Sequence, residues 1–141
     1  MSFATRTAKG LLDTLFGKTS VFGALGTAPV IHVGLSSTTP AADGTNITEE
    51  AANGYARDAT VAGDWVTATS ADPSVLDNGN AITFATATGD WVSAANLTYF
   101  VLMDALTVGN MLIAGALGTA KPVLNGDTAS FPVGDLNVTL T

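Results

Sequence analysis

Short runs of β-prone residues, separated by Gly, Pro, Asn and Asp, follow one another from Pro29 to the end of the chain. Seven of these runs are clear and a weaker eighth lies near Trp65; the seven are residues 30–35, 55–61, 81–85, 98–103, 111–117, 128–133 and 136–140. Several short strands with turn residues at this spacing favour a sandwich, and about eight strands favour a jelly roll. The sequence therefore predicts an all-β fold, an antiparallel and jelly-roll-like β-sandwich.

The order of apolar and polar residues within the runs predicts how deeply each strand is buried. Residues 136–140 alternate between apolar and polar side chains, as in a strand with one buried face. Residues 99–103 and 111–113 are continuously apolar, as in central strands. Between the runs, left-handed backbone conformations are expected at three Asn-Gly pairs: Asn53-Gly54, Asn78-Gly79 and Asn125-Gly126.

One short helix is predicted ahead of the runs. Apolar residues recur at helical spacing and form one stripe on it: Ala8, Leu11, Leu12, Leu15 and Phe16. Gly17 is a suitable end for this helix. We therefore divide the chain into an N-terminal arm with a short amphipathic helix, residues 1–28, and a β-sandwich domain, residues 29–141.

The arm is also the candidate for contacts with other subunits. It carries three of the five basic residues, on a chain whose formal net charge is -7. An acidic neighbouring protein would attract such a basic segment. The candidate partner-binding residues are Arg6, Lys9, Leu11, Leu12, Leu15 and Phe16. An apolar stripe does not say whose core it enters, so packing of the helix on its own sandwich stays open.

Composition limits the classes of partner. The 12 acidic residues outnumber the 5 basic ones, and a nucleic-acid surface needs clustered Lys and Arg, so we expect no nucleic-acid partner. No apolar run approaches membrane-spanning length, so we expect no membrane partner either. Charged residues make up only 12% of the chain, which lowers the cost of desolvating its surface against other proteins.

Residues able to carry out catalysis are few. The chain has no cysteine and one histidine, His32, and it contains neither G-x-S-x-G nor H-E-x-x-H. We therefore expect no enzyme, no cofactor and no metal, whereas an exposed His32 beside a serine and a carboxylate would favour an enzyme. Residues 43–50 are rich in oxygen ligands but lack the Asp-x-Asp-x-Asp-Gly pattern, which favours a polar turn over a weak calcium site.

The order of motifs along the chain is more informative than any one of them. The series is residues 32–40 (HVGLSSTTP), 43–45 (DGT), 48–49 (TE), 54–57 (GYAR), 80–84 (NAITF), 87–91 (ATGDW), 104–105 (DA), 109–110 (GN), 115–117 (GAL) and 126–128 (GDT), before a closing strand at 136–140. In this order the motifs resemble a family of small virion proteins of tailed bacteriophages, over residues 30–141. The chain departs from the family pattern at Leu106-Thr107-Val108, where members usually carry a more polar, Gly-rich turn.

Members of that family are similar to jelly rolls or related sandwiches and are described as tail-fibre or head decoration proteins. We interpret the chain as a capsid decoration (cement) protein on the outer surface of the virion, because the sequence shows no coiled-coil or repetitive fibre shaft. The resemblance then implies the major capsid protein as partner, a homotrimer, and assembly in the cytoplasm of the bacterial host. The alternative is a tail-fibre or tail-tip component, or a lectin-like module with Trp65, Trp91 or Tyr99 stacking on sugars.

Overall fold

The computed structural model describes residues 5–18 and 28–140. Contacts within the chain divide it into two compact units. Unit 1 contains the described residues of 1–29, 61–82 and 131–141, and unit 2 contains residues 30–60 and 83–130. Unit 1 thus joins the N-terminal helix to two later segments of the chain, whereas the sequence was divided only at residue 29.

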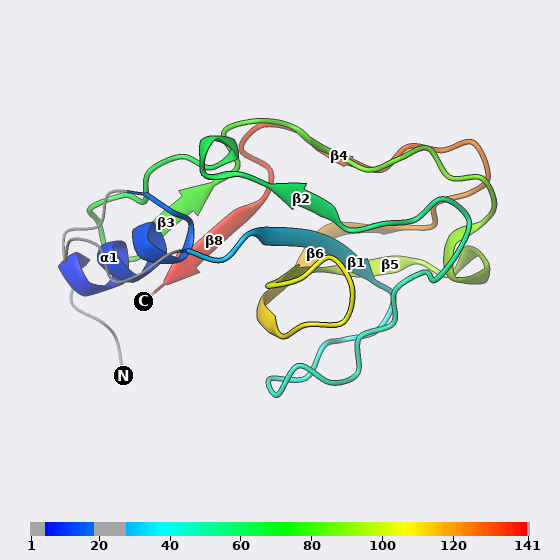
Figure 1. The fold of residues 1–141 in the computed structure, drawn as a ribbon, viewed down its shortest axis with the longest axis horizontal. Helices are drawn as coiled ribbons and strands as arrows, with labels where there is room; N and C mark the ends of the chain where they lie inside the picture. The colour runs from blue at the N-terminus through cyan, green and yellow to red at the C-terminus, as the bar shows by residue number, and fades with distance from the viewer. Residues whose placement is uncertain (1–4, 19–27, 141) are drawn as a thin grey trace. The chain divides into compact units, whose positions relative to one another are not determined.

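Strands dominate the described residues, in which there are eight strands, one α-helix and two short 3-10 helices (Figure 1). Their bounds are α1 Thr5–Leu15, β1 Ile31–Ser36, β2 Asp58–Thr60, η1 Ala62–Asp64, β3 Ser74–Asp77, β4 Ile82–Thr83, η2 Trp91–Ala94, β5 Leu97–Met103, β6 Met111–Lys121, β7 Ser130–Phe131 and β8 Asn137–Leu140. The strands form one four-stranded sheet and two sheets of two strands, β3 with β8 and β4 with β7. The expected all-β antiparallel fold with an N-terminal helix is confirmed.

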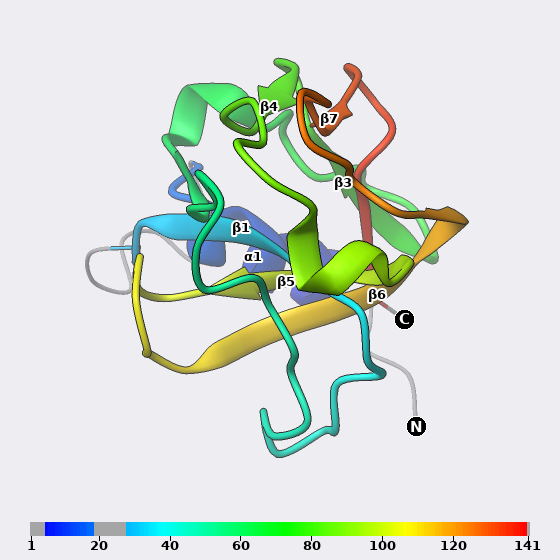
Figure 2. The same ribbon diagram turned by 90° about the vertical axis from the view of Figure 1, so that its right-hand side faces the viewer.

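The four-stranded sheet lies in unit 2 and has the order β2-β1-β5-β6. Figure 2 shows β1, β5 and β6 of this sheet side by side. Its inner strands carry the core residues Val33 and Leu35 of β1 and Val101 and Leu102 of β5, all buried. Because neighbouring residues in a strand point to opposite faces, β5 is covered on both sides. The continuously apolar run at 99–103 is therefore a central strand, as expected.

β6 is one of the two edge strands of this sheet, so the expectation that residues 111–113 belong to a central strand is wrong. Residues 111–113 remain partly exposed, and within the part of the chain that the structure describes β6 has a neighbouring strand on one side only. Phe100 of β5 covers Gly115, and a Cβ at that position would lie 2.5 Å from its ring. An apolar run predicts that a strand is shielded from solvent, but it does not show whether the residues that shield it belong to the same chain.

Unit 1 packs the helix against a small sheet. α1 contacts β3 and β8, and Figure 1 shows the three side by side. Leu12 and Phe16 are buried, and the ring of Phe16 lies edge-on to Trp65, with centroids 4.5 Å apart. The helix thus contributes to the core of its own unit.

Two local expectations differ from the structure. The weak run near Trp65 is an isolated bridge to Asn78, and the strand of this region is β3, where none was expected. Asn53-Gly54 and Gly126 have the expected left-handed φ values, but Gly79 is not among the described residues with positive φ.

A buried asparagine connects separate segments of unit 1. Asn78 Nδ2 donates to the carbonyl oxygens of Asn80 and Pro132, at 2.9 and 2.8 Å. Asn78 Oδ1 accepts from the backbone amide of Leu136 at 2.9 Å. One side chain, with 0% exposure, therefore satisfies three backbone groups that the short strands leave outside their ladders.

We predict that Asn78→Asp lowers the free energy of unfolding by about 2–4 kcal/mol at neutral pH, because aspartate cannot donate to two buried carbonyl oxygens and leaves a buried charge without donors. Denaturant unfolding followed by tryptophan fluorescence measures this loss. The matched control is Asn96→Asp, the same change at an exposed position, which should alter stability by less than about 0.5 kcal/mol. Equal effects of the two substitutions would contradict the role of Asn78.

Candidate functional site

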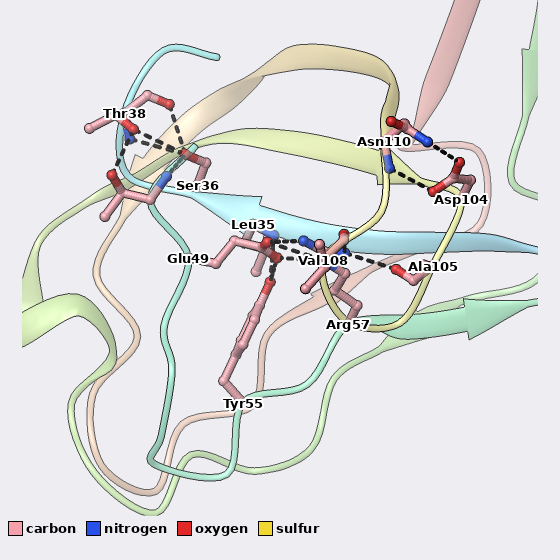
Figure 3. Close-up of polar contacts among 11 residues, drawn as sticks. Leu35, Ser36, Thr38, Glu49, Tyr55, Arg57, Asp104, Ala105, Val108 and Asn110 are labelled. Atoms are coloured by element: carbon pink, nitrogen blue, oxygen red, sulfur yellow. Dashed lines mark hydrogen bonds and ion pairs between the residues drawn. The ribbon is translucent and has the colours of Figure 1, made fainter. Parts of the chain in front are cut away.

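A carboxylate, a phenol and a guanidinium group meet over the middle of β1 (Figure 3). The Tyr55 hydroxyl donates to Glu49 Oε1 at 2.5 Å and accepts from the backbone amide of Leu35 at 2.9 Å. Arg57 Nη2 lies 2.5 Å from Glu49 Oε2, and Arg57 Nε lies 3.1 Å from each carboxylate oxygen. The side chains of Arg57 and Glu49 are 9% and 14% exposed, so the ion pair is largely shielded from water.

Glycine at position 34 makes room for this cluster. A Cβ on Gly34 would overlap the Glu49 carboxylate and would lie 3.1 Å from the Tyr55 hydroxyl. A glycine inside a strand often marks a site where another group approaches the backbone closely, and that is its role in β1.

The surroundings of Tyr55 fix its protonation state. Burial raises the pKa of Tyr55 well above its ordinary value of 10.0, and the negative charge of Glu49 and the hydrogen bond to it raise the pKa further. The phenol therefore keeps its proton at physiological pH and acts as a donor to Glu49.

Arg57 also holds the loop that joins β5 to β6, residues 104–110. Its Nη1 donates to the carbonyl oxygens of Ala105 and Val108, at 2.8 and 2.7 Å. Arginine has five donor hydrogens in a rigid fork, so a single side chain can bind a carboxylate and two carbonyls together. The loop is thereby tied to this largely shielded ion pair.

The same loop displays apolar side chains. Leu106 is 50% and Val108 is 86% exposed, and Val108 has a φ of 57°, which β-branched residues rarely adopt. At the base of the loop, Asp104 accepts from the backbone and side-chain amides of Asn110, at 2.7 and 2.8 Å. These bonds lower the pKa of Asp104. Leu106 and Val108 belong to the segment at which the chain departs from the family pattern.

A second polar cluster closes the loop that follows β1. Ser36 Oγ accepts from the backbone amides of Thr38 and Thr48, at 3.2 and 3.0 Å. Thr38 Oγ1 donates to the carbonyl oxygen of Asn46 at 2.7 Å. The hydroxyl residues of the motif at 32–40 therefore serve to shape this loop (Figure 3).

Glu50 supports a left-handed turn at residues 92–94, whose φ values lie between 48° and 61°. Its Oε2 accepts from the backbone amide of Val92 at 2.5 Å, and this bond lowers the pKa of Glu50. Just before the turn, the Trp91 ring is buried and its Nε1 donates to the carbonyl oxygen of Asn53 at 3.0 Å. Backbone strain of this kind persists only where the surrounding contacts enforce it.

The aromatic residues proposed for sugar stacking are mostly part of the core. Trp65 and Trp91 are 2% and 0% exposed, so neither offers a face to a ligand. Trp91 packs edge-on against Tyr55, with centroids 5.0 Å apart. Tyr99 is partly exposed.

The apolar candidate residues of the arm have different surroundings. Leu12 and Phe16 are buried in unit 1, Leu15 is partly exposed, and Leu11 is 39% exposed. Binding of this helix to another subunit stays a prediction, and of these four side chains Leu11 is the most accessible for it.

The basic candidates of the arm differ as well. Lys9 donates to Asp13, a buried carboxylate that also accepts from the backbone amide of Ala68 at 2.9 Å. Lys9 is therefore engaged within its own unit. Arg6 lies in α1, and its side chain is outside the described residues.

Other candidate chemistry is reported for the described residues only. Among them, no group of three or more His, Cys, Asp and Glu side chains could hold a metal ion, and no helix is long and apolar enough to cross a membrane. Asp43 accepts from the amide and hydroxyl of Thr45, as in a polar turn. The ring of His32 has its Nδ1 3.1 Å from the carbonyl oxygen of Val30.

Several motifs of the resemblance converge on the cluster around Glu49. Gly34, Glu49, Tyr55, Arg57 and the loop 104–110 all belong to or contain quoted motifs. The sequence marked these residues but not their ion pair. A signal was present, because charged residues are scarce in this chain and two of opposite sign, Glu49 and Arg57, lie in successive motifs of the series.

The all-β fold and the order of its motifs indicate a small structural protein of a tailed-phage virion. Residues 2–139 match the family model described as podophage GP4 fiber I protein gp80, and the chain belongs to this family. The resemblance to tailed-phage virion proteins is thereby confirmed. A search of curated proteins found no match.

We predict that Arg57→Gln lowers the free energy of unfolding by about 3–5 kcal/mol, because it leaves the Glu49 carboxylate buried without its cation. Denaturant unfolding at pH 7 measures the loss. The double variant Arg57→Gln with Glu49→Gln removes both charges and should be less destabilised than the sum of the two single variants. Strict additivity would show that the ion pair contributes nothing.

The raised pKa of Tyr55 predicts a loss of stability in alkali. The unfolded phenol ionises near pH 10.0, whereas the folded one resists ionisation, so its contribution is fully present below pH 10.0 and is lost as the pH rises above it. In a Tyr99→Phe background, where Tyr55 is the remaining tyrosine of two, phenolate absorbance should appear only together with loss of the near-ultraviolet tryptophan spectrum. Ionisation near pH 10 with an intact fold would overturn this prediction.

Proposed function

We propose that this protein is a subunit of a fibre on a podophage virion, and that it acts by packing against other proteins and not by catalysis. The observation that carries the proposal is the family match, which spans residues 2–139 and whose description names a fibre protein. The protein is a virion structural protein by its family; its place on the particle is the proposed part.

The use that the chain makes of its few charged and polar residues supports a structural role. Glu49 and Arg57 form an ion pair with each other, Glu50 binds a backbone amide, and Asp104 closes a loop. Each of these groups is engaged in holding loops on the sheet of unit 2. Such loops, positioned by a rigid scaffold, are suited to contacts with other proteins.

Capsid decoration, which the sequence favoured, is the second candidate. It was preferred because the chain shows no coiled coil or repetitive shaft. A fibre can contain several proteins, however, and a short β-rich subunit can lie at a junction or a tip without supplying the shaft. In the fibre role the partners are fibre proteins and further copies of this chain, and in the decoration role the partner is the major capsid protein on the capsid surface. We propose neither nucleic acid nor membrane as a partner in either role.

Imaging of intact particles tests the location. We predict that virions carrying a tagged copy of this protein show the tag on a fibre when examined by electron microscopy with a gold-labelled probe. The matched control is the same tag on the major capsid protein, which should label the shell evenly. Even labelling of the shell by the tagged chain would overturn the fibre proposal in favour of capsid decoration.

A further inference from the structure

β6 is a long edge strand, and among the described residues no strand pairs with its outer side. It runs over 11 residues, Met111–Lys121, at one end of the sheet order, and residues 111–120 contain no charge and no proline. Proteins commonly protect the edges of sheets with charges, prolines or very short strands. The opposite edge of this sheet is protected in that way, because β2 has three residues and includes Asp58. β6 therefore offers backbone donors and acceptors to a further strand.

The loop 104–110 stands at the start of this edge and is held in one conformation. Arg57 binds two of its carbonyl oxygens, and Asp104 with Asn110 closes its base. Its exposed side chains are therefore placed before any partner arrives, which reduces the entropy lost on binding. The left-handed φ of Val108 carries a cost that this scaffold sustains.

We propose that β6 and the loop 104–110 form a single surface that pairs with the same surface of a second copy of this chain. The two β6 strands lie antiparallel about a two-fold axis near Ala114, and two four-stranded sheets join at their edges.

The length of the edge argues for a second copy as the occupant. Within unit 2, β2 offers three residues as a partner edge. With the axis near Ala114 and pairing from Leu112 onward, the two-fold pairing joins residues 112–116 of each copy of β6, so it is longer than any pairing of β6 with β2 of another copy. A two-fold pairing of β6 with itself uses the same patch on both copies and closes the assembly.

Charge is the ground on which we place the axis near Ala114, because residue 121 of one copy then comes opposite residue 107 of the other. Lys121, the one charged residue of β6, then approaches the partner copy's loop 104–110, which carries the ionised Asp104. A parallel pairing in register would instead bring the two Lys121 side chains together.

The pairing of β6 with β5 is irregular near the end of β6. Tyr99 pairs with Ala116 and Leu97 with Lys121, so residues 117–120 form a bulge with fewer residues opposite them on β5. In the two-fold arrangement these residues lie opposite residues 108–111 of the second copy, where Val108 is exposed. At the other end of the strand, Gly44 lies close to Met111, so the continuous pairing begins at Leu112.

This inference deepens the proposed function by naming a subunit partner, and it rests on that function only in requiring contacts between subunits. The pairing also predicts the number of copies in the assembly. Copies join in twos, so the smallest assembly has twice the 14.2 kDa mass of the chain. If the trimer implied by the resemblance forms as well, the assembly has six copies.

Single cysteines test the geometry, because the chain has none of its own. Leu112→Cys, Ala114→Cys and Ala116→Cys are prepared separately and oxidised mildly. The residue nearest the two-fold axis faces its own copy, so we expect a disulfide-linked dimer from one of these variants, with Ala114→Cys the first choice. Ser93→Cys, at an exposed position outside β6, should remain uncrosslinked. Failure of all three β6 variants to crosslink above the Ser93→Cys level overturns the proposal.

A charge on the edge tests the pairing itself. Ala116 is exposed, so Ala116→Lys should leave the fold intact, as checked by circular dichroism, while raising the dimer dissociation constant by at least about tenfold. Ala116→Thr is the matched uncharged control and should retain the dimer. Light scattering that finds the wild type monomeric, or trimeric with no response to Ala116→Lys, overturns the pairing.

Labelling of virions, taken together with the crosslinking result, distinguishes the failure of one proposal from the failure of the other. A wild-type protein that crosslinks through β6 but labels the shell evenly would overturn the fibre proposal and leave the pairing standing. A wild-type protein that labels a fibre, but does not crosslink and does not respond to Ala116→Lys, would overturn the pairing alone.

Discussion

The ion pair between Glu49 and Arg57 is the constraint on which the loops of unit 2 depend. Removing two charges from water costs several kcal/mol, and their attraction offsets that cost only when further hydrogen bonds satisfy both groups. Here the Tyr55 hydroxyl donates a further hydrogen bond to the Glu49 carboxylate, and two loop carbonyl oxygens accept hydrogen bonds from the Arg57 guanidinium group. Those additional partners belong to separate segments of the chain. Satisfying the pair therefore fixes β1, the segment 49–57 and the loop 104–110 with respect to one another within the unit.

Unit 1 meets the same physical requirement with different residues. Its paired strands β3 and β8 have four residues each, so many backbone groups near them lie outside a ladder. Asn78 and Asp13, both buried, supply the missing partners through their side chains. Where strands are short, buried polar side chains thus make hydrogen bonds that a longer ladder would supply from the backbone.

The sequence predicted the features that depend on neighbours along the chain. The apolar run of β5, the alternation at 136–140 and the helical stripe each record a local burial pattern, and each corresponds to an observed element. The sequence missed β3, because its two apolar residues, Val75 and Leu76, are adjacent and show neither alternation nor a longer apolar run. It also missed the role of Glu49 and Arg57, since their pairing is set by the glycine at position 34 and the approach of distant loops.

The two strained turns, at residues 92–94 and at Val108, show a common arrangement. Each contains a β-branched residue in left-handed conformation, and each is held by a charged side chain from the segment 49–57, Glu50 in one case and Arg57 in the other. That segment therefore links the core of unit 2 to two exposed turns. Strain held in this way keeps the turns in one shape before a partner binds, so less conformational entropy is lost in assembly. In the structural role proposed above, such rigidity is an advantage, because the surface of each subunit must match its neighbours repeatedly and without adjustment.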